Sequence, residues 1–146
     1  MKPHQRKPVI AEHLKQRKEA QTVEDADSFN SLHPSWRLTN LQLVDPYGWH
    51  ALSFAKIQEI RAKLAEYEKK DWNEILIREK KRNKSVLVGD LKCPKAKKWL
   101  ADNMPDQEEI WSLRLAGAER IWGIYSQGVF SLIWWDPNHL IWEMEN

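Results

Sequence analysis

The last third of the chain alternates between apolar and polar residues, and this pattern constrains the fold more than any other feature. Three alternating runs, IWSLRLAG, ERIWGIYS and GVFSLIWWD, are separated only by short turns. Gly117 and Gly128 lie in these turns and can supply the positive φ angles that tight hairpins need. Alternation with a period of two is typical of strands. The pattern therefore predicts a three-stranded antiparallel meander.

The middle of the chain has helical periodicity instead. In LSFAKIQEIRAKLAEYEKK, apolar residues recur every three or four positions, which predicts an amphipathic helix. Asp71 and Glu74 have the spacing of a capping box, which predicts the start of a second helix that ends near residue 80. Pro94 fits the first turn of a third, short helix. A strand from about residue 36 to 44 precedes them, and SVLVG is either a short strand or an extended link.

The order of these elements predicts an α+β domain with an N-terminal strand, two to three helices, and then the three-stranded antiparallel meander. We expect the helices to pack on one face of the sheet. Residues 1–30 are polar and charged with little apolar periodicity, so we expect a flexible charged arm there. A single α+β domain would then occupy residues 31–146.

Pairing the strands about their two glycine turns predicts which side chains share a face of the meander. We place Leu115 opposite Arg120, and Trp122 opposite Leu132. The resulting core face carries Trp111, Leu113, Leu115, Trp122, Ile124, Phe130, Leu132 and Trp134. The opposite face is mixed and carries Ser112, Arg114, Ile121, Gly123, Tyr125, Ser131, Ile133 and Trp135. Arginine and aromatic side chains on an open face suit phosphate and stacked bases, although a simple salt bridge is the alternative role for Arg114.

Cations gather in the middle of the chain although its net charge is only +2. REKKRNK, residues 78–84, and KCPKAKK, residues 92–98, are the two basic runs. Such runs are either solvated helix faces or patches that bind a polyanion, so Lys81, Arg82 and Lys84 are candidate RNA-binding residues.

His139 follows the third alternating run, after the turn DPN. Histidine is the side chain that transfers protons most readily near neutral pH, which makes His139 a candidate acid or base. A structural or merely exposed histidine is the alternative.

Several classes of function lack their signatures in this chain. It has no P-loop, dinucleotide fingerprint, HExxH motif or EF-hand loop, so we expect no small-molecule cofactor. One cysteine and five scattered histidines do not argue for a metal site or a disulfide framework. No apolar run approaches the roughly 18 residues of a membrane span, and the N-terminus lacks the apolar block of a signal peptide. We therefore expect a cytoplasmic protein with no membrane partner.

The segment WSLRLAGAERIWGIYSQGVFSLIWWDPNH, with the element order before it, resembles the RelE/ParE toxin superfamily. Members commonly carry leucine-arginine on the second strand, a glycine turn, an arginine opening the third strand, and a basic or histidine residue after the fourth. The matching positions here are Leu113-Arg114, Gly117, Arg120 and His139. The tail looks more closely like a tryptophan-rich set of small, uncharacterised proteins of bacteria and mobile elements. The resemblance covers about residues 36–142.

This resemblance implies a RelE-like fold and a toxin-like endoribonuclease of a toxin–antitoxin system. In the ribonuclease branch of the superfamily, the 2′-hydroxyl of RNA attacks the adjacent phosphate. Arg114 would then stabilise the developing charge, Arg120 would support it, and His139 would be the acid or base. Tyr125 and Trp135 would contact RNA, and the implied partners are RNA or the ribosome and an antitoxin protein.

The chain also departs from the family pattern. The usual extra lysines on the second strand are missing, and Glu119 could neutralise the neighbouring Arg120. The alternative function is a non-catalytic RelE/ParE-like module that binds a protein or nucleic acid, because the ParE branch inhibits a topoisomerase without cutting RNA. A small helper protein of a mobile element, whose tryptophans serve only packing, is the third hypothesis.

Overall fold

The sheet of this protein has five strands and is mixed. A computed structural model describes residues 29–142 of the chain. The strands are β1 (Ser35–Arg37), β2 (Lys84–Leu87), β3 (Glu109–Arg114), β4 (Arg120–Ser126) and β5 (Val129–Asp136). They lie in the order β1-β5-β4-β3-β2. β1 pairs with β5 in parallel, and the other neighbouring strands are antiparallel.

Two α-helices and one π-helical segment connect the strands. Helix α3 (Phe54–Tyr67) begins after Ser53, whose side-chain oxygen accepts the backbone N–H of Lys56 at 3.1 Å. The π-helical segment η3 (Asn73–Arg78) begins after Asp71, whose carboxylate accepts the N–H of Glu74 at 2.9 Å. Helix α4 (Pro94–Asn103) has proline in its first turn, where a missing N–H costs nothing. Short 3₁₀ turns span Trp49–Ala51 and Val88–Asp90.

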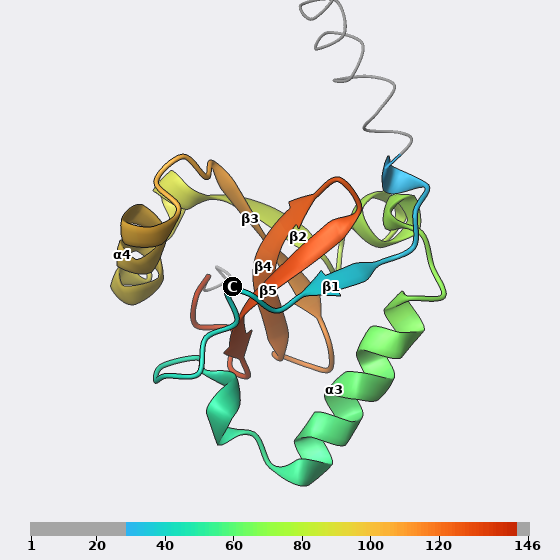
Figure 1. Cartoon of the computed structure of the whole chain (residues 1–146), viewed down its shortest axis with the longest axis horizontal. Coiled ribbons are helices and arrows are strands. Elements are labelled where there is room, and N and C mark those ends of the chain that lie inside the picture. Colours follow the sequence, from blue (N-terminus) through green and yellow to red (C-terminus); the bar gives the residue numbers. More distant parts are fainter. Residues whose placement is uncertain (1–28, 143–146) are drawn as a thin grey trace, which may run out of the picture.

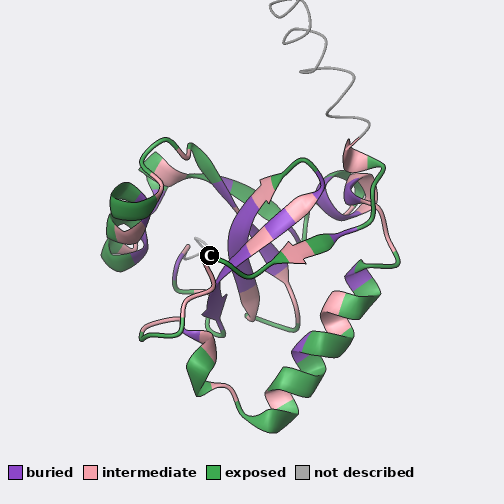
Figure 2. Cartoon of the chain, in the orientation of Figure 1, coloured by how far each residue is buried: buried purple, intermediate pink, exposed green. Residues whose placement is uncertain are grey.

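Helical segments cover both faces of the sheet, as Figure 1 shows for α3 on one side and α4 on the other. The first core, beneath α3 and η3, contains Ile60, Tyr67, Trp72, Ile75, Leu76, Leu113, Ile121, Phe130, Leu132 and Trp135. The second core, beneath α4, contains Val86, Leu91, Ala96, Leu100, Ile110, Trp122, Ile124, Ile133, Trp134 and Ile141. Buried residues therefore run along the central strands, whereas the outer side of α3 is exposed (Figure 2).

The α+β class is confirmed, but three expectations about the fold are wrong. The meander β3-β4-β5 is only part of the larger sheet, and the helices do not pack on one face alone. The N-terminal strand covers three residues, because beyond Arg37 the chain leaves β5 as a loop whose Gln42 N–H donates to the carbonyl of Ile133. The charged arm lies almost wholly outside the described residues. At its end, Asn30 accepts a hydrogen bond from the hydroxyl of Tyr125.

The expected register of the meander is also wrong. The first turn closes on a Leu115–Glu119 pair, so that Leu113 lies opposite Ile121 instead of Trp122. In the second hairpin, β5 has one residue more than β4 between the Gly123–Leu132 and Trp122–Trp134 pairs, which is a β-bulge. A shift of one residue moves a side chain to the other face of a sheet.

The shifted register removes the mixed open face that we expected. Leu113 and Trp122 pack in different cores, whereas the sequence pattern had placed them together. Ile121, Ile133 and Trp135, expected on the mixed face, are all buried. These central residues of the expected face are therefore not available to a ligand.

Gly123 permits the close approach of β4 and β5 at the bulge. A Cβ atom there would overlap the carbonyl oxygen of Ser131 and would lie 2.6 Å from a ring carbon of Phe130. We expect Gly123→Ala to lower the free energy of unfolding by about 1–3 kcal/mol or more, because backbone cannot yield as a flexible side chain does. Urea denaturation measures the change. Gly89→Ala is the matched control, since no atom lies within 4 Å of its Cβ position, and an equal loss in both variants would contradict the prediction.

Candidate functional site

The β3–β4 hairpin ends in two arginines that lie directly opposite each other. Arg114 is the last residue of β3, Arg120 is the first of β4, and they are partners in the ladder. Directly opposed residues project to the same face of a sheet with their Cβ atoms about 4.5–5.5 Å apart. Partial burial lowers the pKa of Arg120, and the positive charge of Arg114 lowers it further. Two adjacent guanidinium groups of this kind favour an anion between them.

The turn after β5 holds His139 in place. Asp136 is fully buried, and its carboxylate accepts the backbone N–H groups of Leu140 and Ile141, each at 2.9 Å. It also accepts the indole N–H of Trp122 at 3.1 Å. His139 itself has a φ of 57°, in the left-handed region, and its ring lies 6.5 Å from the Trp122 ring. One buried carboxylate therefore fixes both the turn and the aromatic wall beside the histidine.

His139 lies in the electrostatic field of Arg120 and Lys84. Burial is the largest cause that lowers the pKa of His139, and the charges of Arg120 and Lys84 lower it too. Asp136 acts in the opposite direction and raises it. The imidazole is therefore mainly neutral at neutral pH and can accept a proton. We call Lys84, Arg114, Arg120 and His139 the cationic cluster.

We expect the imidazole of His139 to titrate below its ordinary pKa of 6.5. Arg120→Ala removes a repelling cation, so the NMR titration midpoint of His139 should move upward in that variant. Arg61→Ala, an exposed change on α3, should leave the midpoint unmoved. A wild-type midpoint at or above 6.5 would contradict the prediction.

The same shift makes stability depend on pH. The folded state binds a proton at His139 less readily than the unfolded chain, so protonation of His139 favours the unfolded chain. The contribution of neutral His139 to the free energy of unfolding is therefore complete above pH 6.5. It is lost as the pH falls below that value, and His139→Ala should remove this component of the acid sensitivity.

Two residues that the sequence did not reveal fix the end of β3. The Asn83 side chain is 1% exposed, accepts the backbone N–H of Arg114 at 3.0 Å, and donates to the carbonyl of Ile75 at 3.0 Å. The Tyr67 hydroxyl donates to the carbonyl of Arg114 at 2.6 Å. The only signal for Asn83 is that it is the one neutral polar residue in the run REKKRNK. Asp136, also missed, is the aspartate of the Asp-Pro turn before His139.

Glu119 does not neutralise Arg120. Its carboxylate instead pairs with the ammonium of Lys56 at 2.6 Å. The Arg120 guanidinium donates from Nη1 to the backbone carbonyls of Gly117 and Glu119, at 2.7 and 3.0 Å. Arg120 is therefore hydrogen-bonded to its own turn, and Glu119, its neighbour in sequence, does not neutralise its charge.

The two aromatic residues expected to contact RNA do not join the cationic cluster. Trp135 is 6% exposed and packs in the first core, with its ring 6.1 Å from that of Trp49. Tyr125 lies at the opposite end of β4 from Arg120, and its ring packs 4.8 Å from that of Trp72. Trp135 thus has no ring face for a base. Both residues pack in or against the first core, because α3 and η3 cover the face that they share with Ile121.

The three basic residues expected to bind RNA lie on exposed surface from the turn after η3 to the first residue of β2. Lys84 is in β2, next to β3, and contributes to the field at His139. Arg82 lines a cavity together with Arg114. Lys81 is exposed in the turn before them. The structure therefore brings two of the three close to the arginine pair.

Among residues 29–142, no group of three or more histidine, cysteine or acidic side chains is placed to hold a metal ion. Within the same range, no helix is both long enough and apolar enough to cross a bilayer. Comparison of the chain with protein families, with curated proteins and with solved structures finds no match.

Proposed function

We propose that the chain is a toxin-like endoribonuclease that cuts RNA at the cationic cluster. One observation supports this most: Arg114 and Arg120 are paired across the hairpin, and the turn fixed by Asp136 holds His139 close enough for Arg120 to lower its pKa. These are also the residues that the RelE/ParE resemblance implies for catalysis. Phosphate binding and proton transfer are thus assigned to groups that share one end of the sheet.

In the proposed reaction the 2′-hydroxyl of RNA attacks the adjacent phosphorus atom. Neutral His139 takes the hydroxyl proton as the P–O2′ bond forms, and the P–O5′ bond breaks. The departing 5′ oxygen takes a proton from water. Arg114 and Arg120 stabilise the negative charge that accumulates on the phosphate oxygens. The products are a 2′,3′-cyclic phosphate and a 5′-hydroxyl.

Inducible expression in bacteria tests the proposal in cells. We expect the wild type to arrest growth, and Arg114→Ala and His139→Ala to relieve the arrest at equal levels of folded protein. Lys98→Ala is the matched control, because Lys98 is an exposed cation of α4 that pairs with Asp102. Arrest that survives both cluster substitutions would contradict cleavage at the cluster, and no arrest at all would contradict a toxin.

A second function, the binding of a protein partner without catalysis, is favoured by an apolar groove beside α3. The groove has a volume of about 400 Å³ and is lined by Ile57, Ile60 and Leu64 of the helix. Leu38, which is 62% exposed, lines it from the loop after β1. Trp36 also lines it, and its buried indole N–H has no acceptor among the described residues.

Such a groove suits a target protein that presents apolar side chains and one acceptor for the indole. Under this second function, Leu38→Asp would abolish the effect on growth and Arg114→Ala would leave it intact. Under cleavage at the cluster, and with no partner present, Leu38→Asp would leave the growth arrest intact and Arg114→Ala would relieve it.

A further inference from the structure

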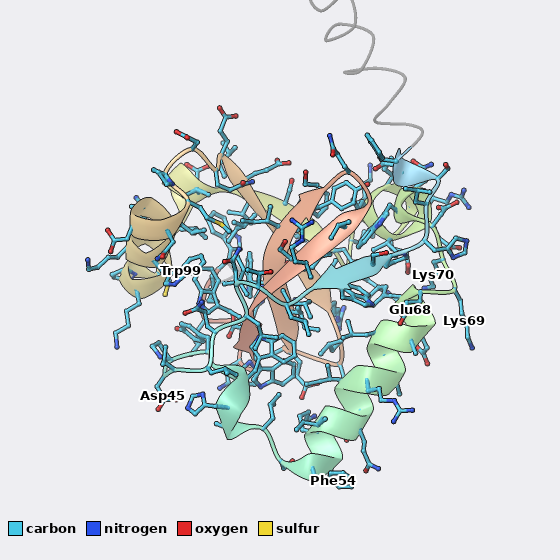
Figure 3. The ribbon with its side chains drawn as sticks, in the orientation of Figure 1. Asp45, Phe54, Glu68, Lys69, Lys70 and Trp99 are labelled. Atoms are coloured by element: carbon cyan, nitrogen blue, oxygen red, sulfur yellow. The ribbon has the colours of Figure 1, made fainter. Side chains whose placement is uncertain are left out.

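A polar cavity of about 230 Å³ lies beside the cationic cluster, and Arg114 lines it. Its walls come from the end of α3, the end of η3 and the β3–β4 turn. The charged side chains in these walls are Lys63, Glu66, Lys70, Glu79, Arg82 and Arg114. Figure 3 places Lys70 just beyond the end of α3. The cavity shares no lining residue with the apolar groove, and Arg114 is the residue that it has in common with the cationic cluster.

Both acidic groups of the cavity already have lysine partners. The ammonium of Lys70 lies 2.9 Å from each carboxylate oxygen of Glu79. The ammonium of Lys63 lies 3.5 Å from the carboxylate of Glu66. These two pairs cancel in charge, so the net positive charge of the cavity comes from its two arginines.

Neither arginine of the cavity has an acidic partner. Among residues 29–142, no carboxylate forms a salt bridge with the guanidinium of Arg82 or Arg114. Their backbones are nevertheless fixed, since Arg82 N–H donates to the carbonyl of Glu79 at 2.9 Å and Arg114 N–H donates to Asn83. Burial raises the pKa of Tyr67, which also lines the cavity, so its hydroxyl stays neutral.

Two arginines line one small cavity and have no carboxylate partner among residues 29–142, so the cavity keeps a surplus of positive charge that suits the oxygens of a phosphate. Arginine binds phosphate oxygens through two parallel N–H groups, which lysine cannot do. When one phosphate of a regularly spaced polymer lies at the cationic cluster, the next phosphate of the same strand lies a short distance away. Arg114 belongs to both places and can therefore contact neighbouring phosphates of one strand.

We infer that this cavity is a second phosphate subsite, which holds the RNA phosphate next to the one that is cut. The choice of RNA as the source of the phosphate rests on the proposed function, because a free phosphate ion has the same chemistry. Arg82 is then a binding residue for substrate, and the site requires a strand with at least two phosphates.

Binding of a short 2′-O-methyl RNA tests this subsite without cleavage, because the 2′-hydroxyl is blocked. We expect Arg82→Ala to weaken binding about tenfold, as for the loss of a charge-assisted contact. Replacing one phosphate at a time by neutral methylphosphonate should reveal one position that weakens the wild type to a similar extent. The same replacement should have no further effect in Arg82→Ala.

Arg61→Ala, which removes an arginine from the apolar groove instead, should leave the affinity unchanged. An equal loss in Arg61→Ala and Arg82→Ala would overturn the subsite in favour of a general charge effect. Binding of inorganic phosphate that depends on Arg82, with no effect of Arg82→Ala on the oligonucleotide, would overturn RNA as the source. If the expected binding results are obtained but the protein does not cleave RNA, the proposed nuclease activity is refuted and the phosphate subsite stands.

Discussion

Replacing Arg114 with alanine is expected to lower the rate of RNA cleavage by about 10²–10³-fold, the usual cost of removing one group that stabilises transition-state charge. The domain should remain folded, because the contacts that Arg114 makes within the described chain use its backbone. Its N–H donates to Asn83 and its carbonyl accepts from Tyr67, and alanine keeps both groups. Single-turnover cleavage of a labelled RNA measures the effect, and circular dichroism verifies the fold.

Arg114→Lys separates charge from geometry at this position. It keeps the positive charge but loses the planar pair of N–H donors, so we expect it to restore only part of the rate. Arg61→Ala should cleave at the wild-type rate. A rate that is unchanged in Arg114→Ala would show that the arginine pair takes no part in the reaction.

Asp136→Ala is expected to lower the free energy of unfolding by about 3 kcal/mol or more, since each buried donor left without an acceptor costs about 1–3 kcal/mol. The substitution removes the acceptor of the Trp122 indole and of the Leu140 and Ile141 N–H groups at once. Asp136→Asn keeps one acceptor oxygen and should lose less. Chemical denaturation measures both variants.

Asp102→Ala is the matched control for that substitution. Asp102 forms an exposed pair with Lys98, and such pairs contribute about 0–1 kcal/mol. A loss in Asp136→Ala no larger than in Asp102→Ala would contradict the role of the buried carboxylate. Because the same carboxylate fixes the turn of His139, Asp136→Asn should also change the NMR titration of that imidazole.

The helices could be predicted from the sequence because their signals are local. The apolar repeat of α3, the Asp71 cap before η3 and the proline at the start of α4 each act within a few residues, and the structure confirms all three. The alternation of β3, β4 and β5 is equally local and is also confirmed as strand. Packing against distant parts of the chain then stabilises helices and strands that the local sequence already favours.

The faces of the sheet could not be predicted because they depend on register. A turn that closes on Leu115 and Glu119, in place of Leu115 and Arg120, moves every residue of the hairpin by one position. The bulge beside Gly123 depends on the close approach of two strands, which no local pattern encodes. Trp135 is unavailable to RNA for a different non-local reason, because α3 and η3 cover the face that it shares with Ile121.

The candidate site was accessible from the sequence only in part. Arg114, Arg120 and His139 could be named, because they border the turns of the meander and match the motif that the resemblance carries. The groups that position them, Asn83 and Asp136, act through buried side chains from distant places in the chain. Their roles become visible only once the strands are paired.

Cleavage at the cationic cluster is tested most directly by the products that purified wild-type protein forms from a labelled RNA. Attack by the 2′-hydroxyl predicts a 2′,3′-cyclic phosphate on one fragment and a 5′-hydroxyl on the other. A single 2′-deoxynucleotide before the cleaved phosphate should abolish cutting at that position and leave cutting elsewhere intact. Cutting at the deoxy position, or intact RNA after incubation with folded wild-type protein, would contradict the proposed reaction.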